Sequence, residues 1–122
     1  MKHILVIDDV STNLKYANMI LHDQYEVTML KSGKDALEYL SDHIPDLILL
    51  DICMQGMNGY EVMEHLRQNP ATAKIPVILI TAEFEEESRE KGISLGAVDF
   101  INKPFEPQVL LKRIEAVWKE EE

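Results

Sequence analysis

Five short apolar runs alternate with longer stretches of mixed polarity along the chain. The runs are rich in Ile, Leu and Val and are bounded by polar residues, Gly or Pro, a pattern that predicts buried β-strands. They span residues 4–7, 25–30, 47–51, 77–81 and 98–102. In the third run, four apolar positions end abruptly on the carboxylate of Asp51. The rest of the chain is organised around this run.

The intervening stretches carry apolar residues at helical spacing and begin with residues that favour helix N-termini. Ser11 or Thr12 is placed to cap the first helix, Ser32 the second and Asn58 the third. We therefore predict a helix after each of the first three runs.

The last two helices differ in how much apolar area they offer. The fourth stretch is heavily charged, and its apolar stripe is thin, with Ile93 and Leu95 near its end. We expect this helix to be the least tightly held, because little apolar area fixes it. Pro107 suits the first turn of the fifth helix. The expected buried face of that helix comprises Leu110, Leu111, Ile114, Val117 and Trp118.

Five strands alternating with five helices predict an α/β fold, in which a parallel sheet is covered by helices on both faces. Right-handed crossovers leave few topologies, although the pattern alone does not order the strands. A chain of 122 residues that is 46% hydrophobic has the size of one domain. We expect a single domain over residues 1–122, with an acidic tail at 119–122.

The composition of the chain argues against several classes of function. The net charge of −10 opposes direct binding to nucleic acid, because there is no basic excess to displace counterions. The lone cysteine, Cys53, excludes an internal disulfide and fits a reducing compartment. No apolar stretch approaches the roughly 18 residues of a membrane span, and the first run is too short for a signal peptide. We therefore expect a cytoplasmic protein with no membrane role.

Polar residues stand where four of the five runs end. Asp8 and Asp9 follow the first run, Asp51 ends the third, Thr81 ends the fourth and Lys103 follows the fifth. Parallel strands open on one edge, where open α/β sheets place their sites. Each residue alone has an ordinary explanation as a turn acid, a strand residue or a surface lysine. Their joint placement predicts one shared crevice.

Three carboxylates in one crevice repel one another, so either a pKa rises or a cation lies among them. Oxygen ligands favour Mg²⁺, whereas zinc would need Cys and His residues at ligand spacing. A carboxylate can act as a nucleophile and form an aspartyl-phosphate, while Lys103 and Thr81 hold phosphoryl oxygens. Asp51 is the candidate nucleophile, because the adjacent Asp8 and Asp9 are better suited to hold the metal.

The strand-end residues belong to an ordered set of motifs: Asp8-Asp9, Asp51, Thr81-Ala82, Gly96-Ala97 and Lys103-Pro104-Phe105. At these separations the set resembles the receiver domain of bacterial two-component response regulators. The resemblance covers residues 2–118. It implies a flavodoxin-like, doubly wound five-stranded parallel sheet in the order 2-1-3-4-5, with five helices on two faces. Gln55 and Asn58 stand where many members have proline and aspartate.

The resemblance implies a site for phosphoryl transfer. Asp51 would accept a phosphoryl group from the phosphohistidine of a sensor histidine kinase or phosphotransfer protein. Thr81 and Lys103 would hold the phosphoryl oxygens, and the Lys103–Pro104 peptide bond would be cis. The implied ligands of Mg²⁺, or Mn²⁺, are Asp8, Asp9, Asp51 and the backbone carbonyl of Cys53.

The resemblance also implies how the signal leaves the domain. Phe100 would lie inward or outward depending on whether Thr81 is drawn toward the phosphoryl group. Partner binding would change on the face formed by the fourth helix, the fifth strand and the fifth helix. Cys53 and Glu83, two residues past Asp51 and Thr81, would modulate how fast water removes the phosphoryl group. The downstream partner would be a separate protein or a covalently linked output domain.

Other interpretations stay open at this point. We expect no output domain within the chain, which is either a stand-alone regulator or a receiver cut from a longer protein. A phosphatase of the haloacid-dehalogenase type also uses an aspartyl-phosphate, but it needs an aspartate where Cys53 stands. A flavin-binding domain has a similar sheet, but Asp8 and Asp9 would repel its phosphate. We favour a phosphoacceptor with slow self-dephosphorylation over a turnover enzyme.

Overall fold

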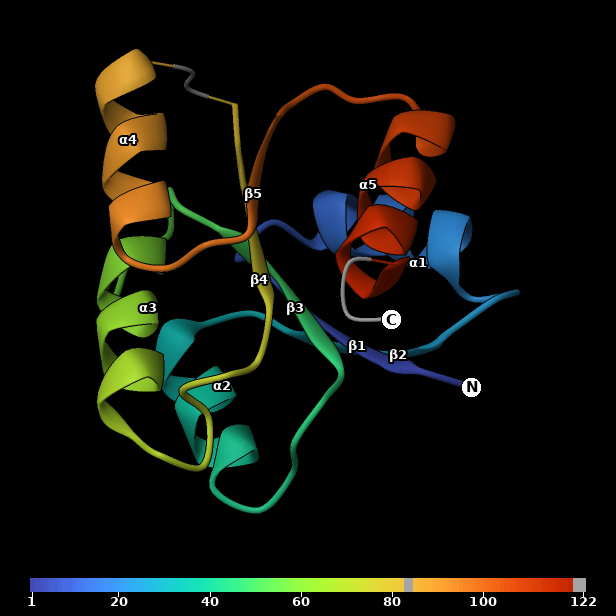
Figure 1. Cartoon of the computed structure of the whole chain (residues 1–122). Helices are drawn as coiled ribbons and strands as arrows, with labels where there is room; N and C mark the ends of the chain where they lie inside the picture. The colour runs from blue at the N-terminus through green and yellow to red at the C-terminus, as the bar shows by residue number, and fades with distance from the viewer. Residues whose placement is uncertain (83–84, 120–122) are drawn as a thin grey trace.

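In a computed structural model of the protein, five strands and five helices alternate over the described residues, 1–82 and 85–119 (Figure 1). The strands are β1 (His3–Ile7), β2 (Glu26–Leu30), β3 (Leu47–Asp51), β4 (Val77–Thr81) and β5 (Asp99–Asn102). The helices are α1 (Ser11–Leu21), α2 (Gly33–Leu40), α3 (Gly59–Gln68), α4 (Glu86–Ser94) and α5 (Pro107–Lys119). Glu83 and the tail residues 120–122 lie outside the described residues. Among the described residues, no helix combines the length and apolarity needed to cross a bilayer.

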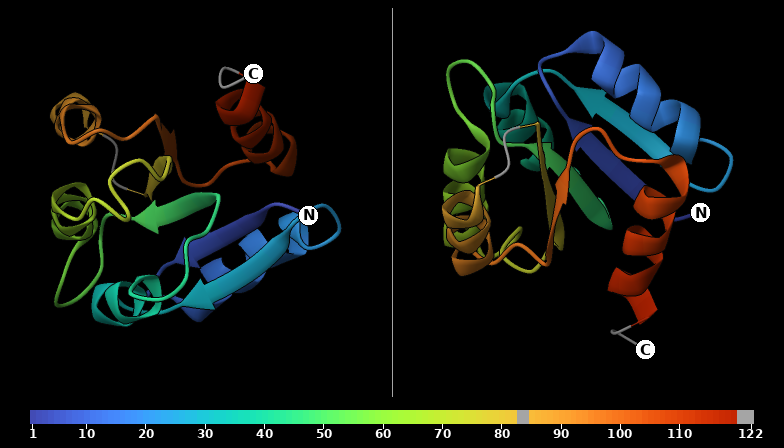
Figure 2. Two further views of the ribbon diagram at one scale, coloured as in Figure 1. Left: turned by 60° about the horizontal axis from the view of Figure 1, so that its bottom comes forward. Right: turned by 90° about the horizontal axis from the view of Figure 1, so that it is seen from above.

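The strands form one parallel sheet in the order β2-β1-β3-β4-β5. Helices α1 and α5 cover one face of the sheet, and α2, α3 and α4 cover the other (Figure 2). This arrangement confirms the predicted fold class and the strand order implied by the resemblance. β3 lies at the centre, so its carboxyl end opens between the ends of β1 and β4.

The core consists of two apolar layers, one on each face of the sheet. Leu47 and Leu49 of β3 pack with α1 and α5, whereas Ile48 and Leu50 pack with α2 and α3. Alternate residues of a strand point to opposite faces, which explains this division. Because both faces of β3 are covered, the strand first approaches water at its last residue, Asp51.

The start of α1 corrects one expectation. The N-cap residue is Val10, and neither Ser11 nor Thr12 caps the helix, so that prediction is wrong. The backbone N–H of Val10 donates to Asp8 Oδ1 at 2.9 Å, so the acid at the end of β1 takes part in the turn into α1.

The predicted caps of the next two helices are confirmed. Ser32 accepts a hydrogen bond from the backbone N–H of Asp35 at 3.0 Å. Asn58 accepts one from the backbone N–H of Glu61, and the Glu61 carboxylate accepts one from the N–H of Asn58. This reciprocal capping box fixes the start of α3 at the end of the loop that follows Asp51.

The predicted apolar stripe of α4 is confirmed only in part: Leu95, the residue that follows the helix, is half-buried and packs against the core, but Ile93 does not. Ile93 is 40% exposed, and the buried residue of this helix is Gly92. A Cβ atom placed on Gly92 would lie 2.5 Å from Leu79 Cδ1, so the helix backbone itself lies against β4. In α5, the predicted face is present but graded: Leu110 and Ile114 are buried, while its other members are half-buried.

Candidate functional site

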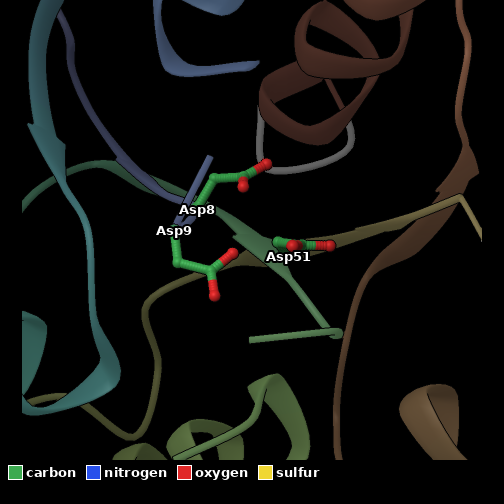
Figure 3. A group of neighbouring side chains, drawn as sticks. All are labelled: Asp8, Asp9 and Asp51. Atoms are coloured by element: carbon green, nitrogen blue, oxygen red, sulfur yellow. The ribbon is translucent and has the colours of Figure 1, made fainter. Parts of the chain in front are cut away.

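Three carboxylates converge at the carboxyl edge of the sheet. Asp8 and Asp9 directly follow β1, and Asp51 is the last residue of the neighbouring strand β3. One oxygen from each lies within 4.8 Å of the others (Figure 3). The structure therefore brings together acids that are more than forty positions apart in the sequence.

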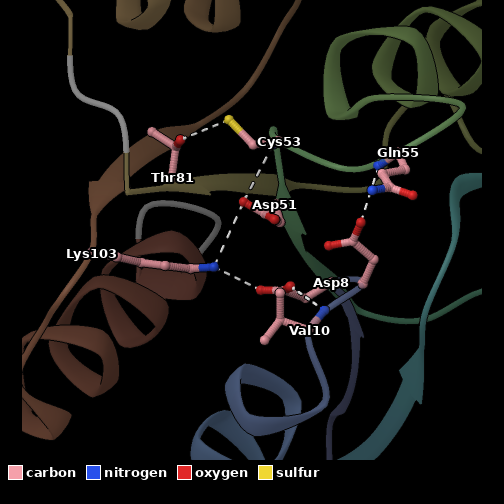
Figure 4. Close-up of polar contacts among 8 residues, drawn as sticks. Asp8, Val10, Asp51, Cys53, Gln55, Thr81 and Lys103 are labelled. Atoms are coloured by element: carbon pink, nitrogen blue, oxygen red, sulfur yellow. Dashed lines mark hydrogen bonds and ion pairs between the residues drawn. The ribbon is translucent and has the colours of Figure 1, made fainter.

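Lys103 brings a positive charge to these acids from β5. Its ammonium nitrogen lies 2.7 Å from Asp8 Oδ2 and 3.6 Å from Asp51 Oδ1 (Figure 4). Its backbone N–H donates to the carbonyl of Thr81 at 2.7 Å, which ties the end of β5 to the end of β4. The Lys103–Pro104 peptide bond is cis.

The two consecutive acids are held by different neighbours. Asp8 is buried and faces Lys103. Asp9 turns to the loop after β3, where its Oδ2 accepts a hydrogen bond from the backbone N–H of Gln55 at 3.0 Å. A proline at this position could not donate this bond, so the departure at Gln55 gives Asp9 a backbone partner.

Asp51 is only 6% exposed, and burial raises the pKa of its carboxyl from 3.8 to about 6. After burial, the largest influence on this pKa is the charge of Lys103, which lowers it. The backbone hydrogen bond from Cys53 also lowers the pKa, whereas the charges of Asp8 and Asp9 raise it. One lysine thus does not offset burial beside two other acids.

Thr81 and Cys53 meet beside Asp51 (Figure 4). Thr81 is 1% exposed, and its hydroxyl oxygen lies 3.5 Å from the Cys53 thiol. The backbone N–H of Cys53 donates to Asp51 Oδ1 at 3.4 Å. The resemblance implied that the backbone carbonyl of Cys53 binds the metal and that Cys53 affects phosphoryl lifetime, but it did not predict this contact of the thiol with Thr81.

Gly59 supports the loop that carries these groups. A Cβ atom at this position would lie 2.6 Å from the carbonyl oxygen of Asp51 and 2.8 Å from Ile52 Cα. Only glycine allows the first turn of α3 to come this close to the Asp51 backbone. The sequence pattern does not predict this contact, because it joins the start of α3 to the backbone of a strand end.

Phe100 lies inward. It is 6% exposed and belongs to the core layer on the α2 and α3 side of the sheet. Its ring approaches α4, because a Cβ atom on Gly92 would be 3.6 Å from Phe100 Cδ2.

The donor set fits a hard divalent cation. Asp8, Asp9 and Asp51 offer carboxylate oxygens at mutual distances of at most 4.8 Å. Mg²⁺ prefers such oxygen ligands and keeps several waters, whereas zinc prefers thiolate and imidazole. A cavity of about 470 Å³ opens beside Asp8, Asp51 and Lys103, which leaves room for a phosphoryl group.

Comparison with known proteins agrees with this geometry. Residues 4–115 match the response regulator receiver domain family. The chain is 40% identical over 111 residues to a probable cyclic di-GMP phosphodiesterase of Vibrio cholerae, covering 91% of this chain and 25% of that protein. It is 35% identical over 119 residues to the phosphate regulon transcriptional regulatory protein PhoB of Escherichia coli, covering 97% and 52%. The chain thus spans between a quarter and about half of these relatives.

Solved structures show the same fold. The chemotaxis protein CheY4 of Vibrio cholerae superposes with a TM-score of 0.91 at 30% identity, over 96% of this chain and 98% of that one. The BeF3-activated receiver domain of DrrB superposes with a TM-score of 0.86 at 31% identity, over 98% of both chains; DrrB is a protein of Thermotoga maritima. Sequence, fold and strand-end residues agree, and the chain belongs to the response regulator receiver domain family.

Proposed function

We propose that this receiver domain, which we take to span residues 1–122, is a phosphorylation-activated switch of a two-component system. Asp51 accepts the phosphoryl group from the phosphohistidine of a sensor histidine kinase or phosphotransfer protein. The supporting observation is the meeting of three acids and one ammonium at a single edge, with Lys103 Nζ 3.6 Å from Asp51 Oδ1.

The proposed step is an in-line transfer to an oxygen of Asp51. The Asp51–phosphorus bond forms, the phosphorus–nitrogen bond of phosphohistidine breaks, and the imidazole leaves with that electron pair. Asp51 must be ionised to attack, and its pKa of about 6 leaves it mostly ionised at pH 7. Lys103 and Thr81 would hold phosphoryl oxygens. In support, Lys103 Nζ lies 3.6 Å from Asp51 Oδ1, and the Thr81 hydroxyl lies 3.5 Å from the thiol of Cys53, whose backbone N–H donates to Asp51.

Mg²⁺, when bound, would neutralise charge on the acids and the transferring group. Its proposed ligands are Asp8, Asp9, Asp51 and the backbone carbonyl of Cys53. Mn²⁺ would fit the same oxygen donors. The supporting observation is the convergence of three carboxylates on one point, with an oxygen of each within 4.8 Å of the others. Burial raises the pKa of Asp51 to about 6, and Asp8 and Asp9 add to that rise, so a bound cation would favour the ionised form of Asp51.

The output of the switch is a change in partner binding on the face formed by α4, β5 and α5. This face presents exposed apolar side chains, which suit a protein partner. They are Ile93, Val98 and Val109, at 40%, 50% and 39% exposure. The inward position of Phe100 and the light packing of α4 support a rearrangement there.

The curated relatives are two to four times as long as this chain, so a linked output domain or a separate protein would carry the response. The domain itself would act in the cytoplasm as a phosphoacceptor and not as a turnover enzyme. A haloacid-dehalogenase-like phosphatase needs an acid where Cys53 stands, and the Cys53 thiol instead contacts Thr81.

The test is incubation with acetyl phosphate and Mg²⁺, followed by intact-mass measurement. We expect one added phosphoryl group on the wild-type protein, none on Asp51→Asn, and none when EDTA replaces Mg²⁺. Asp23→Asn, which changes an exposed acid in the α1–β2 loop, is the matched control and should keep the modification. An unmodified wild-type protein, or a modified Asp51→Asn variant, would contradict the proposal.

A further inference from the structure

Within its bounds, helix α4 (Glu86–Ser94) buries no apolar side chain, and only Leu95, the residue that caps its end, is half-buried against the core. Its buried residue is Gly92, and the nearest atom to a Cβ at that position is Leu79 Cδ1, at 2.5 Å. Ile93, the aliphatic side chain next to it, is 40% exposed. The helix therefore depends on contacts that other elements extend to it.

One such contact comes from Tyr60, the second residue of α3. Its hydroxyl donates a hydrogen bond to the backbone carbonyl of Ser88 in α4 at 3.0 Å. The ammonium of Lys91 lies over the Tyr60 ring, 4.4 Å from its centroid. Lys91 and Gly92 follow Ser88 by three and four positions, so the three residues lie on one side of α4. The left view of Figure 2 shows α3 and α4 next to each other.

The position of Tyr60 is coupled to the Asp51 loop. Its neighbour Gly59 donates a backbone hydrogen bond to Ile52 at 3.0 Å, and a Cβ on Gly59 would lie 2.6 Å from the Asp51 carbonyl oxygen. The first turn of α3 is thus packed directly against the backbone of Asp51 and Ile52. A displacement of that backbone would reach Tyr60 through this contact.

We propose that Tyr60 is a latch that holds α4 in its unphosphorylated position and is released when Asp51 is phosphorylated. This inference rests on the proposed function, because phosphorylation is the event that opens the latch. Tyr60 is a positioning residue that touches no reacting group. A single hydrogen bond and a cation–π contact are weak enough to be made and broken reversibly.

The first test compares hydrogen exchange of the α4 amides in the wild type and in Tyr60→Phe, without phosphoryl donor. Tyr60→Phe keeps the ring and removes the hydroxyl, so we expect α4 to exchange roughly two- to tenfold faster. The matched control is Tyr16→Phe, which removes a hydroxyl–carbonyl bond of the same 3.0 Å length, from Tyr16 to Phe105. It should leave α4 exchange at the wild-type rate. Equal α4 exchange in Tyr60→Phe and the wild type would overturn the latch.

The second test repeats the measurement with beryllofluoride and Mg²⁺ as a phosphoryl mimic. We expect α4 exchange to rise in the wild type and to rise much less in Tyr60→Phe, whose latch is already open. An equal rise in both proteins would show that Tyr60 holds α4 independently of phosphorylation and would overturn the coupling. The intact-mass experiment with acetyl phosphate separates this result from a failure of the proposed function, because it reports phosphoryl uptake at Asp51 whether or not α4 responds.

Discussion

The ammonium nitrogen of Lys103 lies 2.7 Å from a carboxylate oxygen of Asp8, closer than the 3.6 Å that separates it from Asp51. All three side chains are largely buried, at 17% exposure for Lys103 and 6% for each acid. The lysine is thus paired with a proposed metal ligand before any phosphoryl group arrives. On the proposed function, metal binding by Asp8 would free Lys103 to contact a phosphoryl oxygen.

Replacing Lys103 with methionine should weaken binding of the beryllofluoride mimic by roughly 10- to 100-fold, because a charged hydrogen bond to the mimic is lost. The measurement is a titration at saturating Mg²⁺. Lys112→Met, at an exposed position of α5, is the control and should bind the mimic as the wild type does. If Lys103→Met and the wild type bound the mimic with equal affinity, Lys103 would not contribute to holding the phosphoryl group.

The raised pKa of Asp51 predicts a pH dependence of stability. The carboxyl titrates at about 6 in the folded protein and near 3.8 ordinarily, so folding favours its protonated form. This stabilising contribution is complete below about pH 4 and is lost as the pH rises through about 6. Without Mg²⁺, Asp51→Asn should therefore exceed the wild type in free energy of unfolding by roughly 1–3 kcal/mol at pH 8, and by little at pH 4.

Urea denaturation in EDTA across this pH range measures the difference. Added Mg²⁺ should raise the free energy of unfolding of the wild type at pH 8 and should leave that of Asp51→Asn nearly unchanged. If the difference in free energy of unfolding between the two proteins stayed constant from pH 4 to pH 8, folding would not raise the pKa of Asp51.

The hydrogen bond from the Gln55 N–H to Asp9 predicts an effect on metal binding. Gln55→Pro removes the donor and should weaken Mg²⁺ binding by about tenfold, because partners of metal ligands orient them. Gln55→Ala keeps the N–H and is the matched control. Calorimetric titration with Mg²⁺ should separate the two variants. Equal affinities would mean that the backbone bond does not position Asp9.

Phe100 lies inward and buried, so a hydroxyl added to its ring would be buried as well. Burying an unpaired hydroxyl costs about 1–3 kcal/mol. Phe100→Tyr should therefore favour the outward position and tighten beryllofluoride binding, whereas Phe100→Leu should not. An unchanged affinity in Phe100→Tyr would count against a switch that operates through the packing of this ring.

Much of this architecture follows from local pattern. The parallel strands that lead to Asp8, Asp51 and Thr81 open on one edge of the sheet, which places all three residues on that edge although the chain separates them widely. The caps at Ser32 and Asn58 are likewise local, because each needs only a side-chain acceptor three residues before its partner. The strand order came from resemblance to a family, since the apolar pattern does not encode it.

Features that depend on tertiary contact were not predictable. The start of α1 is a local exception: the helix begins earlier than expected, with Val10 as its N-cap residue, and the Val10 N–H donates to Asp8 two positions before it. Gly92, which has no side chain, is the part of α4 that approaches the sheet, and hydropathy gives such a residue no weight. Tyr60 reaches α4 through a hydroxyl whose partner is a backbone carbonyl, for which the sequence carries no signal.

The most direct test identifies the residue that carries the phosphoryl group. After incubation with acetyl phosphate and Mg²⁺, borohydride reduces an aspartyl-phosphate to homoserine, and peptide mass spectrometry locates the change. We expect homoserine at position 51 and unmodified aspartate at positions 8 and 9. Homoserine at position 8 or 9, or none in a protein that has gained phosphoryl mass, would contradict the assignment of Asp51 as the acceptor.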